Sequence, residues 1–297
     1  KNRANLLSKG KSIPFTSKFK SAIARVLIYN KIRDIFGGRI RFMISGAAPI
    51  SPEIIYYFKW MGITIYEAYG MTETTGVISC NKPGFVKIGS VGQLLPETEV
   101  MIADDGEICV RAPQNIKEYY KNEDATNELL KPGSNGSFWL HTGDVGHIDE
   151  DGYLFITDRK KDLIITAGGK NVAPQNIENL LKTSPYVSQA MVFGDKKPYL
   201  TALITMDEDE IAKFARDHKL LYQDLADLSK KEEVYKLYRQ EVHIKNEKLA
   251  SYETIKKFFI LEEDFDQDKD ELTPTLKVRR KVVTERYRDI LENLYKA

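Results

Sequence analysis

The sequence predicts an α/β protein with two domains: a larger region that joins a sheet–helix unit to a small antiparallel β-barrel or sheet, and then a small α+β domain. Three observations support this prediction. Strand and helix patterns alternate in the first part, short strands separated by Asp-Gly turns follow up to residue 158, and a highly charged helical pattern extends from about 207 to 248. The join falls in five consecutive charged residues, 158–162, a composition typical of a linker or hinge.

The first region opens as a strand–loop–helix unit. Residues 39–45 alternate as a strand, and Ser51 and Pro52 then supply a capping hydroxyl and a first-turn proline for a helix. Residues 63–67 form the next expected strand and lead into the loop 69–76. Because open α/β sheets bind ligands at the C-terminal ends of their strands, the two loops are candidate sites.

The later elements follow from turn signals and apolar runs. Asp-Gly pairs at 105–106 and 151–152 predict hairpin turns between short strands. Beyond residue 162 we expect a strand, a Gly-Gly loop, a helix from about 174, and strands at 187–193 and 199–206. This second part is typical of a separate small α+β domain.

Composition excludes several classes of protein. The 44 Lys and Arg residues balance 43 Asp and Glu residues, so the net charge does not favour binding to nucleic acid or to an anionic membrane. Two cysteines and four scattered histidines predict neither a disulfide framework nor a zinc site, and no apolar run approaches the roughly 20 residues of a membrane span. We expect a cytoplasmic protein, with peripheral membrane contact as a further option. The chain begins with Lys rather than Met, which suggests a processed product or an excised piece.

Two short motifs carry groups suited to nucleotide chemistry. In YGMTET, residues 69–74, Glu73 offers a hard carboxylate that suits Mg²⁺. In HTGD, residues 141–144, Asp144 can accept two hydrogen bonds from a vicinal diol such as a ribose. Each motif alone is equally typical of a polar, solvent-facing turn, and the basic segment around Lys277 is equally typical of a solvated surface.

Five motifs occur in the order and at the spacing of one known superfamily. They are SGAAPIS at 45–51, YGMTET, HTGD, GYLFITDRKKDLI at 152–164 and the Lys277 segment LTPTLKVRR. From about residue 39 onwards the chain therefore resembles adenylate-forming enzymes, which include acyl-CoA synthetases, peptide-synthetase adenylation domains and beetle luciferases. Within that superfamily, GGKNVAPQNIENLL, SPYVSQAMVFGD and KLASYETIKKF are similar to bacterial long-chain fatty acyl-CoA synthetases.

The resemblance implies a domain organisation. Residues 1–158 match the C-terminal portion of the large AMP-binding domain, 159–162 match a hinge, and 163–297 match the small mobile C-terminal domain. The Thr/Ser/Gly-rich phosphate loop that normally lies far upstream of SGAAPIS is missing. We therefore expect an incomplete enzyme, inactive as an isolated chain.

In the larger region the resemblance implies contacts to a nucleotide and a metal. The loop that begins at Gly46 is expected along the nucleotide and acyl group, Tyr69 on the adenine, and Asp144 on the ribose hydroxyls. Glu73 is expected to bind Mg²⁺ and to act in catalysis, and Arg159 is expected near the ribose and phosphate. The residues of this region and of the adjoining hinge that are expected to bind nucleotide are Gly46, Ala47, Ala48, Tyr69, Gly70, Thr72, Asp144 and Arg159.

In the small domain the resemblance implies two functional loops and a pivot. Lys277 matches the catalytic lysine that reaches the α-phosphate and the substrate carboxylate. The loop of Gly168, Gly169 and Lys170 matches one that guides the pantetheine of coenzyme A. Lys161 matches the hinge about which the small domain rotates between the two half-reactions.

The function implied is activation of a fatty acid with ATP through an acyl-adenylate, followed by transfer to coenzyme A. The expected ligands are ATP, Mg²⁺, coenzyme A and a fatty acid, with no nucleic acid. Two alternatives stay open from the sequence: a CoA ligase for short or aromatic acids, and a non-catalytic module that binds a nucleotide or coenzyme A.

Overall fold

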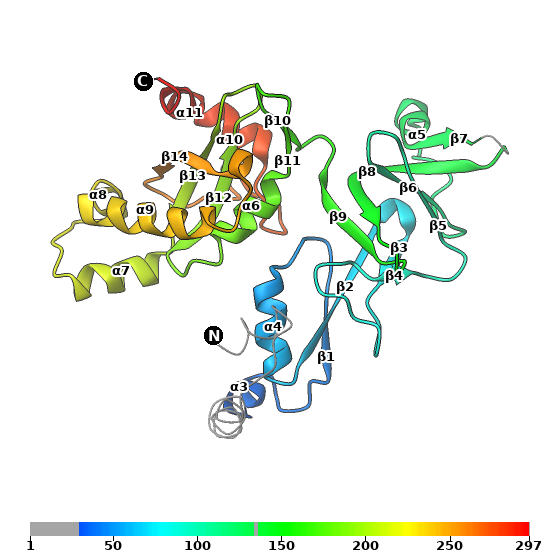
Figure 1. Cartoon of the computed structure of the whole chain (residues 1–297), viewed down its shortest axis with the longest axis horizontal. Helices are drawn as coiled ribbons and strands as arrows, with labels where there is room; N and C mark the ends of the chain where they lie inside the picture. The colour runs from blue at the N-terminus through cyan, green and yellow to red at the C-terminus, as the bar shows by residue number, and fades with distance from the viewer. Residues whose placement is uncertain (1–29, 134–135, 297) are drawn as a thin grey trace. The chain divides into compact units, whose positions relative to one another are not determined.

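The computed structural model describes residues 30–133 and 136–296. The chain divides into two compact units, one that ends at Ile156 and one that begins at Thr157. We call residues 30–156 the first unit and residues 157–296 the second unit; Figure 1 labels their elements. The segment expected as a hinge, 159–162, lies at the start of the second unit.

A mixed four-stranded sheet forms the first part of the first unit. The strand order is β1-β2-β3-β4; β1 and β2 are parallel, whereas β3 and β4 continue the sheet in antiparallel fashion. Helix α4 connects the parallel strands and packs against β2. The elements are α3 Asn30–Ile35, β1 Phe42–Ser45, α4 Pro52–Trp60, β2 Thr64–Met71, the 3₁₀ turn η2 Thr72–Thr74, β3 Gly76–Cys80 and β4 Gln93–Leu94.

Helix α4 begins where the sequence predicts. Ser51 is its N-cap residue, the Ser51 hydroxyl accepts the Glu53 backbone N–H at 3.3 Å, and Pro52 takes the first helical position. The parallel pairing places Ser45 beside Glu67. As a result β1 and β2 deliver the loops that follow them to the same edge of the sheet.

The second part of the first unit is an antiparallel sheet of order β5-β6-β8-β7, with β9 paired to β8. Of the two forms expected, the antiparallel sheet is confirmed and the small β-barrel was wrong, because no closed barrel forms in the part of the chain that the structure describes. In that part β5 pairs with β6 and the three-residue β7 pairs with β8, so the two edges of the sheet do not meet. The elements are β5 Glu99–Ile102, β6 Glu107–Arg111, α5 Glu123–Leu129, β7 Leu130–Pro132, β8 Phe138–Ile148 and β9 Leu154–Arg159, the last of which continues into the second unit.

The second unit is a three-stranded sheet with helices on both faces (Figure 1). Strands β12 and β13 are antiparallel, and β14 adds to β13 in parallel after a long helical connection. A short hairpin, β10 with β11, precedes them. The elements are β10 Ile164–Ile165, β11 Asn171–Val172, α6 Pro174–Leu181, β12 Val187–Phe193, β13 Leu200–Met206, α7 Glu208–Asp217, α8 Leu225–Ser229, α9 Glu232–Asn246, η3 Ser251–Glu253, β14 Ile255–Ile260, α10 Arg280–Arg286 and α11 Arg288–Asn293.

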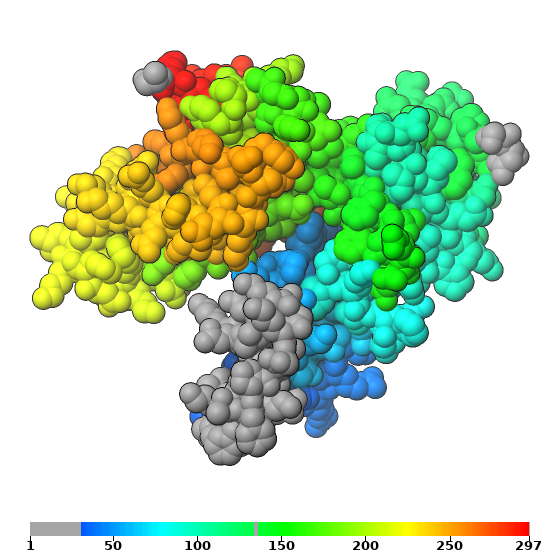
Figure 2. Space-filling model, in the orientation of Figure 1, coloured from blue at the N-terminus to red at the C-terminus, as the bar shows by residue number. Residues whose placement is uncertain are grey.

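Strand β13 is buried along its whole length and separates two apolar layers. On one face Ala202 and Ile204 pack with α6, α7, α8 and α9, and on the other face Leu203 packs with α10 and α11. The charged stretch from about 207 to 248 thus covers the sheet with its apolar side. Its outer side forms a continuous yellow part of the second unit's surface in Figure 2.

The structure offers no helix, within its described residues, that is long and apolar enough to cross a membrane.

Candidate functional site

Tyr69 and Asp144, both expected to bind nucleotide, meet in the structure. The Tyr69 hydroxyl donates a hydrogen bond to Asp144 Oδ2 at 2.6 Å, although 75 positions separate the residues. Tyr69 lies near the end of β2, and Asp144 lies within β8 with 7% of its surface exposed. The bond fixes an aromatic ring beside a carboxylate at the loop edge of the first sheet.

The loop from Gly46 to Ala48 lies at the same edge. It follows β1 directly, and a Cβ atom on Gly46 would lie 3.3 Å from the Ala68 carbonyl oxygen of β2. Ala47 has φ of 64°, in the left-handed region that residues other than glycine rarely adopt. All three loop residues are exposed, so the loop presents backbone groups to solvent beside the end of β2.

The turn after β2 depends on a close approach of two backbone segments. A Cβ atom on Gly70 would lie 1.9 Å from the Gly76 carbonyl oxygen, so only glycine fits at this position. Thr74 is fully buried; its hydroxyl accepts the Met71 backbone N–H at 2.9 Å and donates to the Gly76 carbonyl at 2.7 Å. These contacts hold the 3₁₀ turn η2, which carries Glu73.

Glu73, the expected Mg²⁺ ligand, is partly buried and has a tyrosine partner. The Tyr119 hydroxyl donates to Glu73 Oε1 at 2.5 Å, and the Ile116 backbone N–H donates to the Glu73 carbonyl at 2.8 Å. The hydrogen bond to this carboxylate raises the pKa of Tyr119 to about 12, so the phenol keeps its proton at neutral pH. Thr72 beside it is exposed. Sequence reasoning missed Tyr119, which lies 46 positions away and outside every motif used.

A second carboxylate lies on β2, two residues before Tyr69, and was not predicted. Glu67 is 8% exposed, and burial raises its pKa to about 7, although a hydrogen bond from the Gly89 backbone N–H at 3.2 Å acts in the opposite direction. Residues 67 and 69 share one face of the strand. The only sequence signal was a glutamate inside an otherwise apolar strand pattern.

Lys277 lies at the end of a tight turn in the second unit. An isolated bridge between Leu272 and Val278 closes the turn, and the Lys277 backbone N–H donates to the Thr273 hydroxyl at 3.0 Å. Leu276 has φ of 59°, a left-handed conformation that glycine adopts more easily. The turn thus holds Lys277, which is partly buried, in a defined direction.

The loop of Gly168, Gly169 and Lys170 joins β10 to β11. Gly169 has φ of 71°, and its backbone N–H donates to the Thr166 carbonyl at 2.8 Å. All three residues are exposed, and Lys170 Nζ lies 5.9 Å from the centre of the Tyr252 ring. The β10–β11 hairpin and the Lys277 turn are therefore two separately built loops of one unit.

The expected hinge segment forms a turn directly after β9. The Asp162 backbone N–H donates to the Arg159 carbonyl at 2.9 Å, and the side chains of Arg159 and Lys161 are exposed. Asp158, by contrast, is 3% exposed, and its carboxylate accepts the backbone N–H groups of Arg159 at 2.6 Å and of Gln175, at the start of α6, at 3.2 Å. Burial raises the pKa of Asp158 to about 6.

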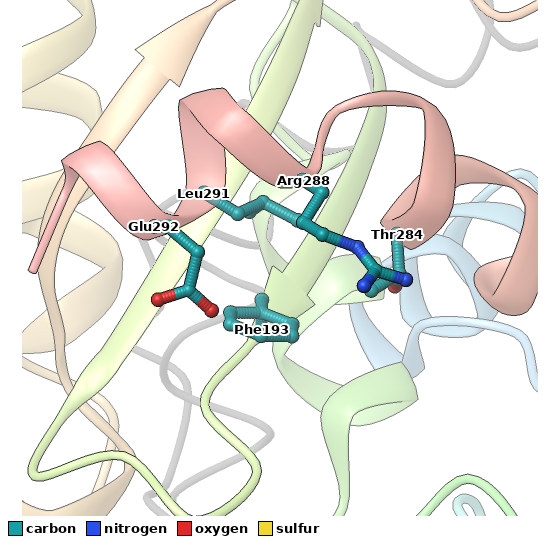
Figure 3. Close-up of a pocket in the computed structure, with 5 residues that line it drawn as sticks. All are labelled: Phe193, Thr284, Arg288, Leu291 and Glu292. Atoms are coloured by element: carbon teal, nitrogen blue, oxygen red, sulfur yellow. The ribbon is translucent and has the colours of Figure 1, made fainter.

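Two surface pockets are lined by other residues. One, of about 210 Å³, lies in the second unit against α10, α11 and the end of β12. Figure 3 shows Arg288 extending across it towards Thr284, with the ring of Phe193 below. Another, of about 290 Å³, lies in the first unit between α4, β2 and the loop 84–88. Neither contains a predicted site residue, so the pockets do not define the candidate site.

Family models and curated relatives identify the family of this chain. The model described as AMP-binding enzyme matches residues 15–120, and the AMP-binding enzyme C-terminal domain matches residues 161–297. The long-chain-fatty-acid–CoA ligase FadD15 of Mycobacterium tuberculosis is 41% identical over 277 residues, which are 93% of this chain and 45% of that protein. Long chain acyl-CoA synthetase 7, peroxisomal, of Arabidopsis thaliana is 34% identical over 93% of this chain and 41% of that protein. The chain spans about half the length of these relatives.

Solved structures place both units in one fold. The adenylation domain of a carboxylate reductase from Mycobacterium chelonae matches with a TM-score of 0.73 at 22% identity, over 99% of this chain and 44% of that chain. O-succinylbenzoate coenzyme A synthetase from Bacillus subtilis, in complex with AMP, matches with a TM-score of 0.59 at 29% identity, over 82% of this chain and 45% of that chain. Together with the two family models and the ligase relatives, this likeness assigns the chain to the AMP-binding, adenylate-forming enzyme family.

Proposed function

We propose that this protein activates a long-chain fatty acid with ATP, through an acyl-adenylate, and transfers the acyl group to coenzyme A. The observation that carries the proposal is the contact between Tyr69 and Asp144 at the loop edge of a parallel strand pair. That edge is where open α/β sheets bind ligands. The curated relatives at 34–41% identity supply the reaction class.

The first unit is proposed to hold the nucleotide. Asp144 accepts hydrogen bonds from the ribose hydroxyls, and the Tyr69 ring, held by its hydroxyl, packs on the adenine. The loop from Gly46 to Ala48 lies along the phosphate and acyl group. Gly70 and Thr72 complete the nucleotide contacts of this unit. Arg159, in the hinge segment at the start of the second unit, is proposed to supply a positive charge near the ribose and phosphate.

Glu73 is proposed to bind Mg²⁺, and its environment fits that cation. A carboxylate oxygen is the ligand type that Mg²⁺ prefers, and Glu73 is partly exposed, with one oxygen held by Tyr119. When bound, Mg²⁺ neutralises charge on the phosphate oxygens of ATP. Tyr119 fixes the direction of the carboxylate, and the high pKa of Tyr119 keeps it a donor.

The second unit is proposed to supply one group to each half-reaction. In the first, the fatty acid carboxylate attacks the α-phosphorus of ATP and pyrophosphate leaves, while Lys277 stabilises charge on the phosphoryl oxygens. In the second, the thiol of coenzyme A attacks the acyl carbon and AMP leaves, while the loop of Gly168, Gly169 and Lys170 guides the pantetheine. Rotation at Lys161 exchanges the two loops at the site. We also propose a cytoplasmic location, with peripheral contact to the membrane that holds the fatty acid.

An aromatic acid is the second candidate substrate. The O-succinylbenzoate coenzyme A synthetase is 29% identical over 82% of this chain. This similarity is the observation that favours an aromatic acid. The long-chain ligases are more similar in sequence, at 34–41%. We therefore rank long-chain acids first.

The decisive experiment is thioester formation by the full-length gene product. Purified protein is incubated with ATP, Mg²⁺, coenzyme A and either palmitate or benzoate, and acyl-CoA and AMP are quantified. We expect palmitoyl-CoA and AMP in equal amounts. Benzoyl-CoA without palmitoyl-CoA would select the aromatic candidate, and nucleotide binding without any thioester would indicate a non-catalytic module.

A further inference from the structure

Strand β8 is irregular at the HTGD motif, so backbone groups there need hydrogen-bond partners other than the neighbouring strand. In the pairing of β6 with β8, Glu107 faces Val145 and Cys109 faces His141. Two steps along β6 therefore match four steps along β8, so residues 142–144 bulge out of the ladder. Such bulges re-aim a side chain, and they leave backbone groups without strand partners.

Side chains supply the partners that the ladder cannot. Thr142 donates from its hydroxyl to the Ile108 carbonyl at 2.7 Å and accepts the Asp144 backbone N–H at 3.0 Å. The Gly143 backbone N–H donates to Glu107 Oε1 at 2.9 Å. Gly143 has φ of 71°, so this amide belongs to a residue in the left-handed conformation.

The other oxygen of Glu107 is held by His141. His141 Nδ1 lies 3.1 Å from Glu107 Oε2; because a carboxylate accepts, this contact is a hydrogen bond when the ring carries its proton on Nδ1. Glu107 is 6% exposed, and a buried carboxylate held on both oxygens has a fixed position. The Glu107 carboxylate therefore contacts the residues on both sides of Thr142 and holds the bulge in place.

We propose that Glu107 is a positioning residue, which, through Gly143, sets where Asp144 lies and so how the site receives a ribose. The role in ribose binding rests on the proposed function, whereas the positioning of Asp144 by Glu107 rests on the geometry alone. Asp144 follows Gly143 directly, and its Oδ2 accepts the Tyr69 hydroxyl at 2.6 Å. A displaced Gly143 moves this acceptor relative to the aromatic ring.

A metal site is the competing explanation of the same residues. One ligand atom each from Glu107, Cys109 and His141 lies within 4.8 Å of the others, a grouping that zinc accepts. Cys109 Sγ lies 3.5 Å from His141 Nδ1. The geometry favours positioning, because both carboxylate oxygens of Glu107 already have partners: the Gly143 backbone N–H at 2.9 Å and His141 Nδ1 at 3.1 Å.

The test compares Glu107→Gln and Glu107→Leu with the matched control Glu99→Gln, which removes an exposed carboxylate from the same sheet. Amide hydrogen exchange of the whole chain is read at Gly143. We expect exchange to accelerate at least about tenfold in Glu107→Leu, less in Glu107→Gln, and not in the control. Unchanged exchange at Gly143 in folded Glu107→Leu would overturn the proposal.

A double-mutant cycle separates positioning from a general structural role. AMP affinity is measured for the wild type, Glu107→Gln, Asp144→Ala and the double variant. If Glu107 acts through Asp144, Glu107→Gln weakens AMP binding about tenfold alone and adds less than about twofold in the Asp144→Ala background. Full additivity would refute the coupling.

Two further outcomes are distinguishable. If the wild-type chain and the full-length product both fail to bind AMP, the proposed function falls, while the exchange at Gly143 still decides whether Glu107 positions the bulge. If Co²⁺ binds the wild type stoichiometrically with a thiolate absorption band that Cys109→Ser removes, the cluster is a metal site and the positioning proposal is overturned.

Discussion

The sheets of the two units differ in how completely their apolar side chains are buried. In the second unit both faces of the β12–β14 sheet are covered, and Leu203 and Tyr238 are fully buried. In the first unit Ile44, on β1, is 66% exposed, although single exposed apolar side chains occur in both units, such as Ile35 at 80% and Leu221 of the second unit at 89%. Burial of apolar surface is the main favourable term in folding, so the second unit has the better-closed core.

The units differ in the opposite way in how their predicted site residues are arranged. The first unit joins Tyr69 directly to Asp144 and supports Glu73 with a tyrosine. The second unit carries Lys277 and the glycine loop on two separately built turns. The second unit thus combines a well-covered sheet with two separate turns, whereas the first unit combines a less covered sheet with a hydrogen-bonded pair of side chains at its edge. The predictions below test each side of this comparison.

The largest expected effect concerns the core of the second unit. Leu203→Ala should lower the free energy of unfolding of that unit by about 2–5 kcal/mol, because it leaves a cavity between two packed layers. Ile44→Ala in the first unit should cost less than about 1 kcal/mol, since the side chain is already exposed. Both tryptophans, Trp60 and Trp139, lie in the first unit, so urea unfolding followed by fluorescence reports that unit and circular dichroism reports both. Equal costs for the two variants would break the comparison.

The second prediction tests the Lys277 turn in the full-length gene product. Lys277→Ala should slow acyl-adenylate formation by roughly 10² to 10³, the usual effect of deleting a charge that stabilises a transition state. Conversion of supplied acyl-adenylate to thioester should be nearly normal. Lys281→Ala, an exposed neighbour on α10, is the control. Equal losses in both half-reactions would remove Lys277 from its proposed role.

The third prediction tests rotation between the units. Lys161→Pro should restrict φ at the hinge and disfavour the helical region at Lys160, so it should impair exchange of the two loops. Thioester formation should fall more than acyl-adenylate formation if the restricted segment still permits the first arrangement. Both steps are measured separately by pyrophosphate exchange and by thioester release. Normal rates in both would show that Lys161 is an ordinary surface lysine.

The fourth prediction concerns the preorganised edge of the first unit. Asp144→Ala removes the acceptors of the ribose hydroxyls, and hydrogen bonds to a charged group contribute about 1.5–3 kcal/mol, so the KM for ATP should rise tenfold or more. Asp151→Ala, which removes a carboxylate that pairs with Lys87 at the surface, is the control and should leave KM unchanged. An unaltered KM in Asp144→Ala would leave HTGD with a purely structural role as the bulge of β8.

Sequence reasoning worked where the signal is local. Ser51 and Pro52 determine the start of α4, and the strands expected at 187–193 and 199–206 differ from β12 and β13 by at most one residue at each end. The strand expected after residue 162 shortens to Ile164–Ile165, because only those residues pair with β11.

Sequence reasoning failed where the partner is distant. Tyr119 lies 46 positions from Glu73, and Glu107 lies 36 positions from Gly143; neither distance follows from a periodicity. The expected barrel fails for the same reason, since closure depends on which edges pair. Motif order identified Asp144 and Tyr69 separately, but their hydrogen bond required the folded chain.

The smallest effect expected is a pH dependence that distinguishes the units by their buried carboxyl groups. Burial raises the pKa of Asp158 in the second unit from 3.8 to about 6, and that of Glu67 in the first unit from 4.5 to about 7. A folded-state pKa above the unfolded value means that the folded protein binds more protons between the two values, so the free energy of unfolding falls as pH rises through each window. The slope is at most about 1.4 kcal/mol per pH unit for each group.

Asp158→Asn should flatten the pH dependence of the free energy of unfolding detected by circular dichroism between pH 4 and 6. Glu67→Gln should flatten the pH dependence detected by fluorescence between pH 5 and 7. If either variant flattened the transition of the other unit instead, the assignment of one buried carboxyl group to each unit's stability would be wrong.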